Sequence, residues 1–267
     1  ARFARRADAA GKPVLAYKLG RSKAGQALAA THTGALAGDD ATADAWLAHH
    51  GIARLRILET LYEAPPLFAG PPSEGRRVAV VTTTGGGGAM VVDALASNGL
   101  EIAPLQPEVA HLLSNHDVAV GQGGLIDLTL AGTRPELVRG VIHALLEADA
   151  VDAVTMVIGS SAQFHPDLAV APLRGFGGSS KPLAIYLVPA AEESRRMLAD
   201  EGLAVFRTAE SCAEGVRARL MRRTPAAEAV DDPSLDAAVQ VLLDDAGGGT
   251  LDEPTIIAMS SATVSAS

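Results

Sequence analysis

The sequence predicts an α/β protein whose largest part, residues 76–223, is a flavodoxin-like, doubly wound parallel sheet. Apolar segments of strand length alternate with segments of helical length throughout this range, which is typical of that fold class. In the first of them, residues 76–83, the apolar residues run consecutively rather than alternate, as expected for a parallel strand covered on both faces. We count five strands with flanking helices in this range.

Helices are expected in this part where apolar residues recur at helical spacing. They are expected at residues 89–100, 107–116, 134–149, 167–175, 192–202 and 209–223. Four consecutive glycines, Gly85–Gly88, are expected to form the turn between the first strand and the first helix. We call them the tetraglycine segment.

The residues before this part predict a smaller set of elements, separated from it by a linker at residues 70–75. We expect a helix at 2–10, a strand at 13–20 and a polar stretch of small residues at 21–38. A helix at 40–50, capped by Asp39 and ended by Gly51, should follow. A strand at 53–57 and a helix at 58–68, broken by Pro65 and Pro66, complete this set. After residue 223 the sequence is polar, with a helix expected at 234–248 and disorder at the end.

Composition limits the classes of partner. Hydrophobic residues make up 48% of the chain, which indicates a globular protein, and the net charge of -9 argues against a nucleic-acid or anionic-membrane surface. The one cysteine, Cys212, excludes an intrachain disulfide and a cysteine-rich metal cage, so a cytoplasmic location is expected. No run approaches the ~20 apolar residues that span a bilayer. The start at Ala1, without Met, indicates a fragment or a processed chain.

A histidine lies among small residues in the segment Thr31–Asp39, which we call the histidine segment, just before a predicted helix. Small side chains let backbone amides approach an anion closely, and the helix start adds a positive dipole end with free N–H groups. A nitrogen of His32 could there attack phosphorus, because the amides would stabilise the transferred charge. The other interpretation is a histidine hydrogen-bonded within an ordinary loop. Spacing alone favours the second.

The tetraglycine segment also has two interpretations. It follows a buried strand and precedes a helix, so it lies at the carboxyl end of the parallel sheet, where doubly wound folds bind ligands. Its amides could cradle a phosphate. It matches neither a P-loop nor a dinucleotide fingerprint, and the other interpretation is a tight turn with packing glycines. Taken with the histidine segment, it predicts two helix starts that could face one anion.

Residues 11–46 resemble the phosphohistidine segment of NDP-forming acyl-CoA synthetases, relatives of succinyl-CoA synthetase. In that family a Lys-Pro strand, a K-x-G-R-S-x-x-G stretch and an S-H-T-G-A-L-A-G loop follow one another. Here they are Lys12-Pro13, Lys18 to Gly25, and Thr31 to Gly38, with threonine in place of the usual serine. The resemblance covers residues 1 to about 222 and outweighs the ordinary-loop interpretation of the histidine.

Two later segments extend this resemblance. Residues 76–95 resemble the start of the family's next flavodoxin-like domain, usually T-N-G-G-G-P-G, from which Thr84 and Gly88 depart slightly. Residues 124–129 resemble the family's N-P-V-D-L-T, with Gly-Leu in place of Asn-Pro and with Asp127 retained.

The resemblance implies that His32 is a phosphoryl carrier. Such enzymes reversibly convert acyl-CoA, ADP or GDP, and phosphate to acid, CoA and nucleoside triphosphate. Phosphate attacks the thioester, the histidine takes the phosphoryl group from the acyl phosphate, and a mobile loop carries it to the nucleotide. The implied phosphate-binding residues are Thr33, Gly34, Ala35 and Gly38 at one helix start, and Gly85, Gly86, Gly87 and Gly88 at the other.

The same resemblance implies the domain organisation and the partners. Residues 1–70 would be the C-terminal part of a succinyl-CoA-ligase-like flavodoxin domain, and residues 76–223 a second flavodoxin-like ligase-CoA domain. Residues 224–267 would be a linker and the start of an ATP-grasp domain. CoA and ADP or ATP with Mg would be substrates bound mainly by CoA-binding and ATP-grasp domains, in the same chain or in a partner subunit. No tightly bound cofactor or resident metal is implied, a homo- or hetero-oligomer is expected, and this chain alone should be inactive.

Two other functions stay open. In some relatives these domains form a regulatory, ligand-sensing module, although a lost histidine would favour that reading and His32 is present. An unrelated FMN-binding flavodoxin is less compatible with the scarcity of aromatic residues. Among the remaining residues, His116 and His165 lie near strand ends and are weaker candidates. Arg174 is expected to be solvated rather than bound to phosphate or CoA, Cys212 to lie in the core, and Trp46 to pack in the core or at a domain interface.

Overall fold

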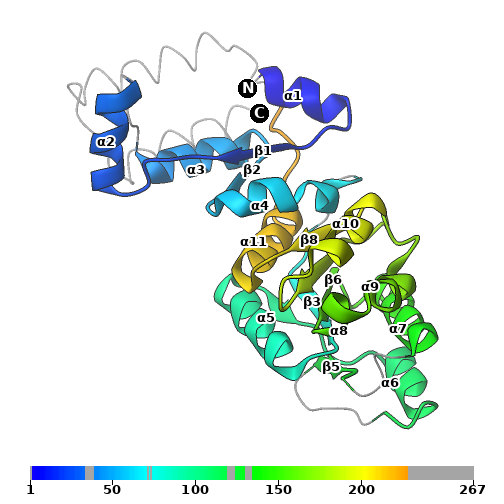
Figure 1. Cartoon of the computed structure of the whole chain (residues 1–267). Helices are drawn as coiled ribbons and strands as arrows, with labels where there is room; N and C mark the ends of the chain where they lie inside the picture. The colour runs from blue at the N-terminus through cyan, green and yellow to red at the C-terminus, as the bar shows by residue number, and fades with distance from the viewer. Residues whose placement is uncertain are drawn as a thin grey trace. The chain divides into compact units, whose positions relative to one another are not determined.

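The computed structural model describes residues 2–33, 39–70, 72, 74–118, 124–129 and 134–227, and within residues 29–33 the backbone alone. Ala1–Ala226 form one compact unit and Ala227–Ser267 a second, and all the described helices and strands belong to the first (Figure 1). The helix predicted at 234–248 and the disordered end predicted after it lie outside the described residues.

The main sheet is parallel and has the predicted doubly wound order. Its strands are β3 (Arg77–Thr82), β4 (Glu101–Ile102), β5 (Leu125–Asp127), β6 (Ala153–Ile158), β7 (Leu183–Leu187) and β8 (Ala204–Phe206). The path β4-β3-β6-β7-β8 places the first strand between the second and a later one, which is the flavodoxin-like arrangement. The predicted fold class is confirmed.

The predicted count of five strands needs one correction. The sheet has six strand segments, because β4 and β5 share one edge of β3. β4 pairs with the start of β3, at Arg77 and Val78, and β5 pairs with its end, from Val80 to Thr82. Each of these segments is too short to cover the six residues of β3, so two of them divide the edge.

The helices follow the predicted pattern with shifted ends. They are α1 (Arg2–Ala9), α2 (Lys23–Thr33), α3 (Asp40–His49), α4 (Leu58–Glu63), η1 (Pro65–Phe68), α5 (Gly85–Ser97), α6 (Pro107–Ser114), α7 (Pro135–Glu147), α8 (Ser161–Phe164), α9 (Pro166–Val170), η2 (Ala171–Leu173), α10 (Glu192–Asp200) and α11 (Ala209–Leu220). The predicted break at Pro65 is confirmed, because α4 ends at Glu63 and a 3-10 turn begins at the proline. The helix predicted at 167–175 is instead α9 followed by η2.

The sheet separates two hydrophobic cores. On one face, the sheet residues Ala79 and Val81 pack with α6, α7, α9 and α10. On the other face, Val78 and Val80 pack with α5 and α11 and also with Leu55, from outside the main sheet. Alternate residues of β3 thus serve opposite cores, which explains why its middle residues, Val78–Val81, are all apolar.

A second, two-stranded parallel sheet lies near the start of the chain. Its strands are β1 (Val14–Tyr17) and β2 (Ile52–Leu55), with Val14 opposite Ile52 and Tyr17 opposite Leu55. Asp39 caps α3 as predicted, because its Oδ2 accepts a hydrogen bond from the Thr42 N–H at 2.9 Å. The helix ends at His49, and Gly51 takes the left-handed conformation that terminates it.

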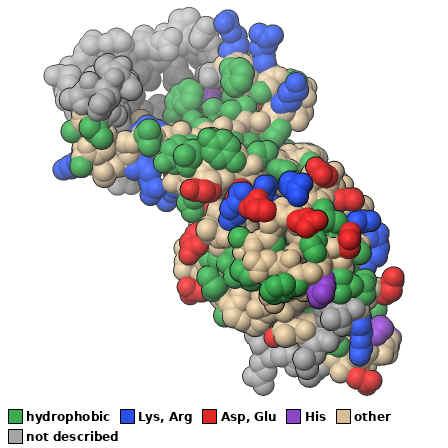
Figure 2. Space-filling model, viewed as in Figure 1, with side chains coloured by type: hydrophobic (Ala, Val, Ile, Leu, Met, Phe, Trp, Pro, Cys, Tyr) green, Lys and Arg blue, Asp and Glu red, His purple; other side chains and the backbone are tan. Residues whose placement is uncertain are grey.

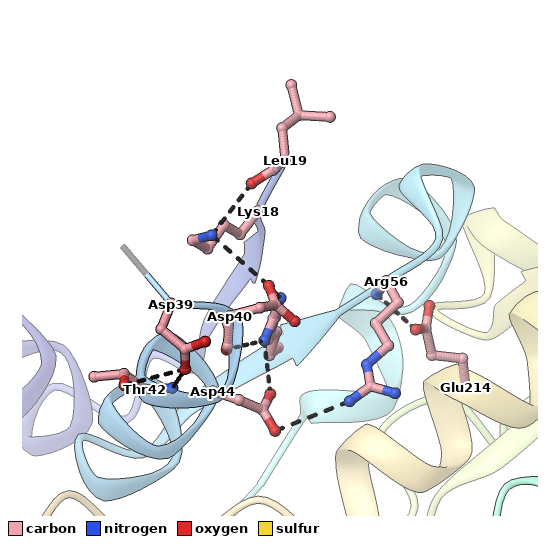
Figure 3. A network of polar contacts seen from close by, with 9 residues as sticks. Lys18, Leu19, Asp39, Asp40, Thr42, Asp44, Arg56 and Glu214 are labelled. Atoms are coloured by element: carbon pink, nitrogen blue, oxygen red, sulfur yellow. Dashed lines mark hydrogen bonds and ion pairs between the residues drawn. The ribbon is translucent and has the colours of Figure 1, made fainter. Parts of the chain in front are cut away.

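A buried carboxylate joins this early segment to the main sheet. Glu214, from the middle of α11, accepts hydrogen bonds from the backbone N–H groups of Arg56 and Ile57, at 2.6 and 3.0 Å (Figure 3). These amides precede α4, which has no side-chain cap of its own, so Glu214 acts as its cap from a distance in sequence. The predicted boundary between residues 70 and 76 stays a prediction.

An ion-pair network reinforces the same junction. Arg207, which follows β8, pairs with Glu63 of α4 at 3.1 Å and with Glu192 of α10 at 3.3 Å. Ser211 also donates to Glu63, at 2.9 Å, inside the protein. Acidic and basic side chains are intermixed on this face around α10 and β8 (Figure 2). The network therefore runs from the surface, at Arg207 and Glu192, to the buried Ser211, and it connects α4, α10 and α11.

Glu214→Ala should lower the free energy of unfolding by about 1–3 kcal/mol, because two partly buried N–H groups lose their carboxylate acceptor. Urea unfolding of the chain measures the change. Glu210→Ala, on the same helix but exposed, is the matched control and should stay within about 0.5 kcal/mol of the parent. Equal effects of the two substitutions would contradict the capping role.

His50 makes stability depend on pH. Its ring is buried against Trp46 and His49, and its Nδ1 has no hydrogen-bond partner among the described residues. Burial, and secondly nearby positive charge, hold the pKa of His50 below its usual value. As the pH falls, His50 is therefore protonated in the unfolded chain first, near pH 6.5. The contribution of the neutral ring to the free energy of unfolding is complete above that pH and is lost as the pH falls below it.

His50→Gln should consequently unfold with a shallower loss of stability between pH 7 and pH 5 than the parent. The measurement is the urea midpoint as a function of pH. His111→Gln, at an exposed position of α6, serves as the control and should keep the parental pH profile. An unchanged profile in His50→Gln would show that the ring is not held neutral by burial.

Candidate functional site

A pocket of about 380 Å³ opens at the carboxyl edge of the main sheet. It lies where β3 and β6 are neighbours and their following segments diverge, which is the switch point at which doubly wound folds bind ligands. Its described lining comes from the turns after β3, β5 and β6 and from α9. The lining residues are Thr83, Thr84, Gly85, Thr129, Gly159, Ser160, Ser161, Leu168 and Ala169.

Threonine hydroxyls fix the turn between β3 and α5. Thr82 Oγ1 donates to the carbonyl of Thr84 at 2.7 Å and accepts from the Thr84 N–H at 3.0 Å. Thr84 is the N-cap residue of α5, and its carbonyl accepts the first intrahelical bond, from Gly88 N–H at 2.9 Å. The start of the helix is therefore held at the sheet edge by side chains that sit in the strand.

The same threonine run ties the two turns of the switch point together. Thr83 donates its N–H to the carbonyl of Val157 at 2.9 Å. Its Oγ1 accepts from the N–H of Gly159, just after β6, at 3.1 Å. Both sides of the pocket mouth are thus cross-linked, which makes the site preformed rather than dependent on a ligand to assemble it.

The tetraglycine segment is the first turn of α5, and the prediction that it forms a separate turn before the helix is wrong. Gly87 and Gly88 are buried because α5 approaches the sheet there. A Cβ at residue 87 would lie 2.5 Å from Val188 Cγ1, and one at residue 88 would lie 2.9 Å from Thr82 Cγ2. These two glycines are packing glycines, which was one of the two expected interpretations.

Gly85 and Gly86 differ from the other two because they are exposed. A Cβ at residue 86 would meet no atom within 4 Å among the surroundings considered, and one at residue 85 would meet Asp127 Oδ2 at 3.6 Å. Packing does not require glycine at either position. The amides of the first helical turn have no carbonyl partner inside the helix, so Gly85 and Gly86 offer N–H groups to a ligand.

The two helix starts expected to face one anion are electrostatically unlike. The first turn of α5 contains no acidic residue, and Thr84 makes no side-chain cap. At α3, the Asp39 carboxylate already accepts a hydrogen bond from the Thr42 N–H. This hydrogen bond is the main reason why the pKa of Asp39 lies below its usual value. Asp40 adds a second carboxylate to the same turn. Thr42 N–H is therefore not free for an anion, and α5 is the better of the two described helix starts for binding one.

Asp127 lies beside the start of α5, near Gly85. It is exposed, and its Oδ1 accepts hydrogen bonds from the N–H of Thr129, at 2.8 Å, and from the hydroxyl of the same residue. The carboxylate is thus engaged in its own turn. It fixes the position of Thr129, which lines the pocket.

His32 belongs to a helix rather than to a loop. The backbone of Thr31, His32 and Thr33 forms the last turn of α2, which replaces most of the polar stretch predicted at 21–38. Alanine, leucine, glutamine and lysine at 23–30 are good helix formers, and that propensity outweighs the small-residue pattern. The side chains of His32 and Thr33, and all of Gly34, Ala35 and Gly38, lie outside the described residues, so their roles stay predictions.

The helix that follows the histidine segment is firmly anchored (Figure 3). Arg54 of β2 pairs with Asp40 and, at 3.2 Å, with Asp44, and its side chain is almost fully buried. Lys18 reaches Asp40 at 3.7 Å and donates to the carbonyl of Leu19 at 3.3 Å. Hydrogen bonding to Arg54 holds the pKa of Asp40 below its usual value. Lys18, which carries part of the family resemblance, thus has a structural role here.

Several residues that line the pocket were not predicted from the sequence as site residues. Thr129, Ser160, Ser161 and Leu168 were not candidates, whereas His165, on the same connection, was. The usable signal was position: residues 159–161 directly follow β6, at the same sheet edge as the tetraglycine segment.

The secondary candidates have ordinary structural roles. His116 and His165 are exposed, and neither lines the pocket. Arg174 is solvated as predicted, with distant partners in Asp167 and Glu201. Cys212 is buried, as predicted, and burial raises the pKa of its thiol. Trp46 is 50% exposed, so the core position that was one of two expected for it is wrong.

Within the described ranges, no helix is long and apolar enough to cross a membrane. The described residues also contain no cluster of three or more His, Cys, Asp or Glu side chains arranged to hold a metal ion.

Comparison with known proteins supports the resemblance to NDP-forming acyl-CoA synthetases. Residues 1–68, which include His32, match the succinyl-CoA ligase like flavodoxin domain. The chain is 25% identical over 210 residues, 76% of its length, to the α subunit of acetate–CoA ligase [ADP-forming] II of Pyrococcus furiosus. It spans 46% of the length of that relative.

Two further proteins extend the likeness. The chain is 32% identical over 161 residues to a trans-feruloyl-CoA synthase from an unknown prokaryotic organism, which covers 58% of this chain and 22% of that protein. The fold matches the dinucleotide-forming acetyl-coenzyme A synthetase 1 of Ca. Korarchaeum cryptofilum, solved with phosphate and ADP. The TM-score is 0.66 at 24% identity, covering 82% of this chain and 49% of that one.

The glycines of α5 should respond differently to alanine. Gly87→Ala should cost about 1–3 kcal/mol of unfolding free energy, because the new methyl group overlaps Val188 and Thr84. Gly86→Ala, one residue away in the same turn, should be neutral or stabilising by up to about 1 kcal/mol, since it meets open space and favours the helix. Urea unfolding of both variants tests this, and a larger cost at residue 86 would overturn the assignment.

Proposed function

We propose that this chain is part of an acid–CoA ligase (ADP-forming) that uses a phosphohistidine at His32. The reaction would interconvert acyl-CoA, ADP and phosphate with acid, CoA and ATP. The observation that carries the proposal is that residues 1–68, which match the succinyl-CoA ligase like flavodoxin domain, include His32 within the family's histidine motif.

The pocket at the sheet edge supports the phosphate-binding half of the proposal. Its floor combines the N–H groups at the start of α5 with the hydroxyl-bearing residues Thr83, Thr84, Ser160 and Ser161. Helix-start N–H groups and hydroxyls around one pocket, without a carboxylate in the first helical turn, suit an anion whose charge is shared over several oxygens. Gly85 and Gly86 allow that anion to approach the backbone closely.

The chemistry divides into three balanced steps. A phosphate oxygen attacks the thioester carbonyl, and CoA leaves as the thiolate, so an acyl phosphate forms. A nitrogen of His32 then attacks phosphorus and the carboxylate leaves as the free acid. Finally the β-phosphate oxygen of ADP takes the phosphoryl group from the histidine. The chain's part in these steps is to hold phosphate at α5 and to carry the phosphoryl group on His32.

The remaining substrates would be held elsewhere. CoA, and ADP or ATP with Mg, would be bound mainly by CoA-binding and ATP-grasp domains of the same protein or of a partner subunit. The relative from Pyrococcus furiosus is named as one subunit of its enzyme, and the solved relative was crystallised with phosphate and ADP, which supports this division of labour. The identity of the acid is not set by the family, because relatives are named for both acetate and ferulate.

The complete enzyme, with its nucleotide-binding partner, should incorporate ³²P from γ-labelled ATP into this chain. The label should be stable in alkali and labile in acid, as a phosphoramidate is. His32→Asn should abolish labelling, because amide nitrogen does not attack phosphorus. The measurement is gel autoradiography of the separated chain.

His116→Asn and His165→Asn are the matched controls and should label as the parent does, because both lie at exposed positions outside the pocket. Labelling of His32→Asn at the parental level would remove the carrier role. Absence of label from the parent in a preparation that turns over would instead point to a route without phosphohistidine.

A further inference from the structure

The lining of the pocket at the sheet edge is chemically mixed. Threonine and serine residues that follow β3 and β6 bring hydroxyl groups to it. Leu168 and Ala169, both on α9, bring apolar side chains, and we call these two residues the apolar wall. A site for inorganic phosphate alone needs no such apolar wall, because all four phosphate oxygens prefer hydrogen-bond donors.

The pocket is also larger than a phosphate group requires. Its volume is about 380 Å³. Water occupies about 30 Å³ in the liquid, and a phosphate group is only a few times larger. Pockets of about 300 Å³ and more commonly hold ligands with an organic part. The apolar wall therefore has room for a group attached to the phosphate.

Leu168 is held in place although it is partly exposed. Its neighbour Val170 on the same helix is fully buried and anchors α9 in the core, whereas Leu168 keeps 38% of its surface exposed at the pocket. The buried hydroxyl of Ser194 on α10 donates to the carbonyl of Ala162 at 2.6 Å, which fastens the adjacent α8. The wall is thus preorganised, and its apolar surface is free to be covered by a ligand.

We propose that Leu168 is a specificity-determining residue that contacts the acyl group of the substrate, and that the site favours apolar acyl groups longer than acetyl. The phosphoryl end of the acyl phosphate lies at the start of α5, and the acyl chain extends toward α9. This inference rests on the proposed function, since it assigns a substrate class to the same pocket. It adds a selection that the phosphate cradle cannot provide, because that cradle contacts only the part common to all acyl phosphates.

Acylphosphonates test the inference, because their carbon–phosphorus bond mimics an acyl phosphate without being transferred. Binding of acetyl-, propionyl- and butyrylphosphonate to the full 267-residue chain is measured by calorimetry. Each methylene covered by Leu168 should tighten binding about fourfold. Leu168→Ala should flatten this gradient, and Leu168→Met, which keeps the apolar volume, should retain it.

Leu58→Ala is the matched control, because Leu58 is similarly exposed, at 43%, and does not line the pocket. It should keep the parental gradient. A parent without a gradient, or a Leu168→Ala variant with an unchanged one, overturns the inference, as does a failure of every acylphosphonate to bind. The proposed function fails separately, through loss of His32 labelling in the complete enzyme, and that result would leave a gradient dependent on Leu168 intact.

Discussion

The close approach of α5 to the main sheet is the constraint on which the pocket depends. Gly87 and Gly88 let the helix start lie against Val188 and Thr82 without side chains between them. Any larger residue at these positions would lift the first turn away from the sheet edge. The hydroxyl of Thr83 then joins the turns after β3 and β6, so the helix start and the opposite wall are held at a fixed separation. The geometry of the pocket at the start of α5 is thus a consequence of packing.

Much of the main sheet could be predicted because its information is local. The apolar runs at 76–83 and 151–159 have the length and composition of buried parallel strands, and helices of ordinary length separate such runs. The order of the strands follows from the general rules for doubly wound sheets. The division of one edge of β3 between β4 and β5 was not predictable, because which strand two short segments pair with is a tertiary property.

The candidate site was predicted in part. The tetraglycine segment was placed at the correct sheet edge, but two of its glycines serve packing and two are exposed, of which Gly85 lines the pocket. A row of identical residues carries no mark of that difference. Leu168 was not found because a leucine after a strand looks like any core residue. Leu168 lines the pocket because its side chain stays partly exposed there, and exposure depends on the tertiary structure rather than on the local sequence. The backbone of His32 ends a helix because residues 23–30 are strong helix formers, a preference that the family motif does not display.

The carboxylate of Asp39 at the start of α3 has a consequence for a shuttling phosphoryl group. The Asp39 carboxylate already neutralises the positive end of that helix, so the helix adds little binding energy for a phosphoryl dianion nearby. A phosphohistidine that was bound tightly at one of its two sites would dissociate from that site slowly, and the equilibrium would shift toward that bound state. Under the proposed shuttle, this weak hold keeps the intermediate close in free energy to its donors and acceptors, which is what a reaction that runs in both directions requires.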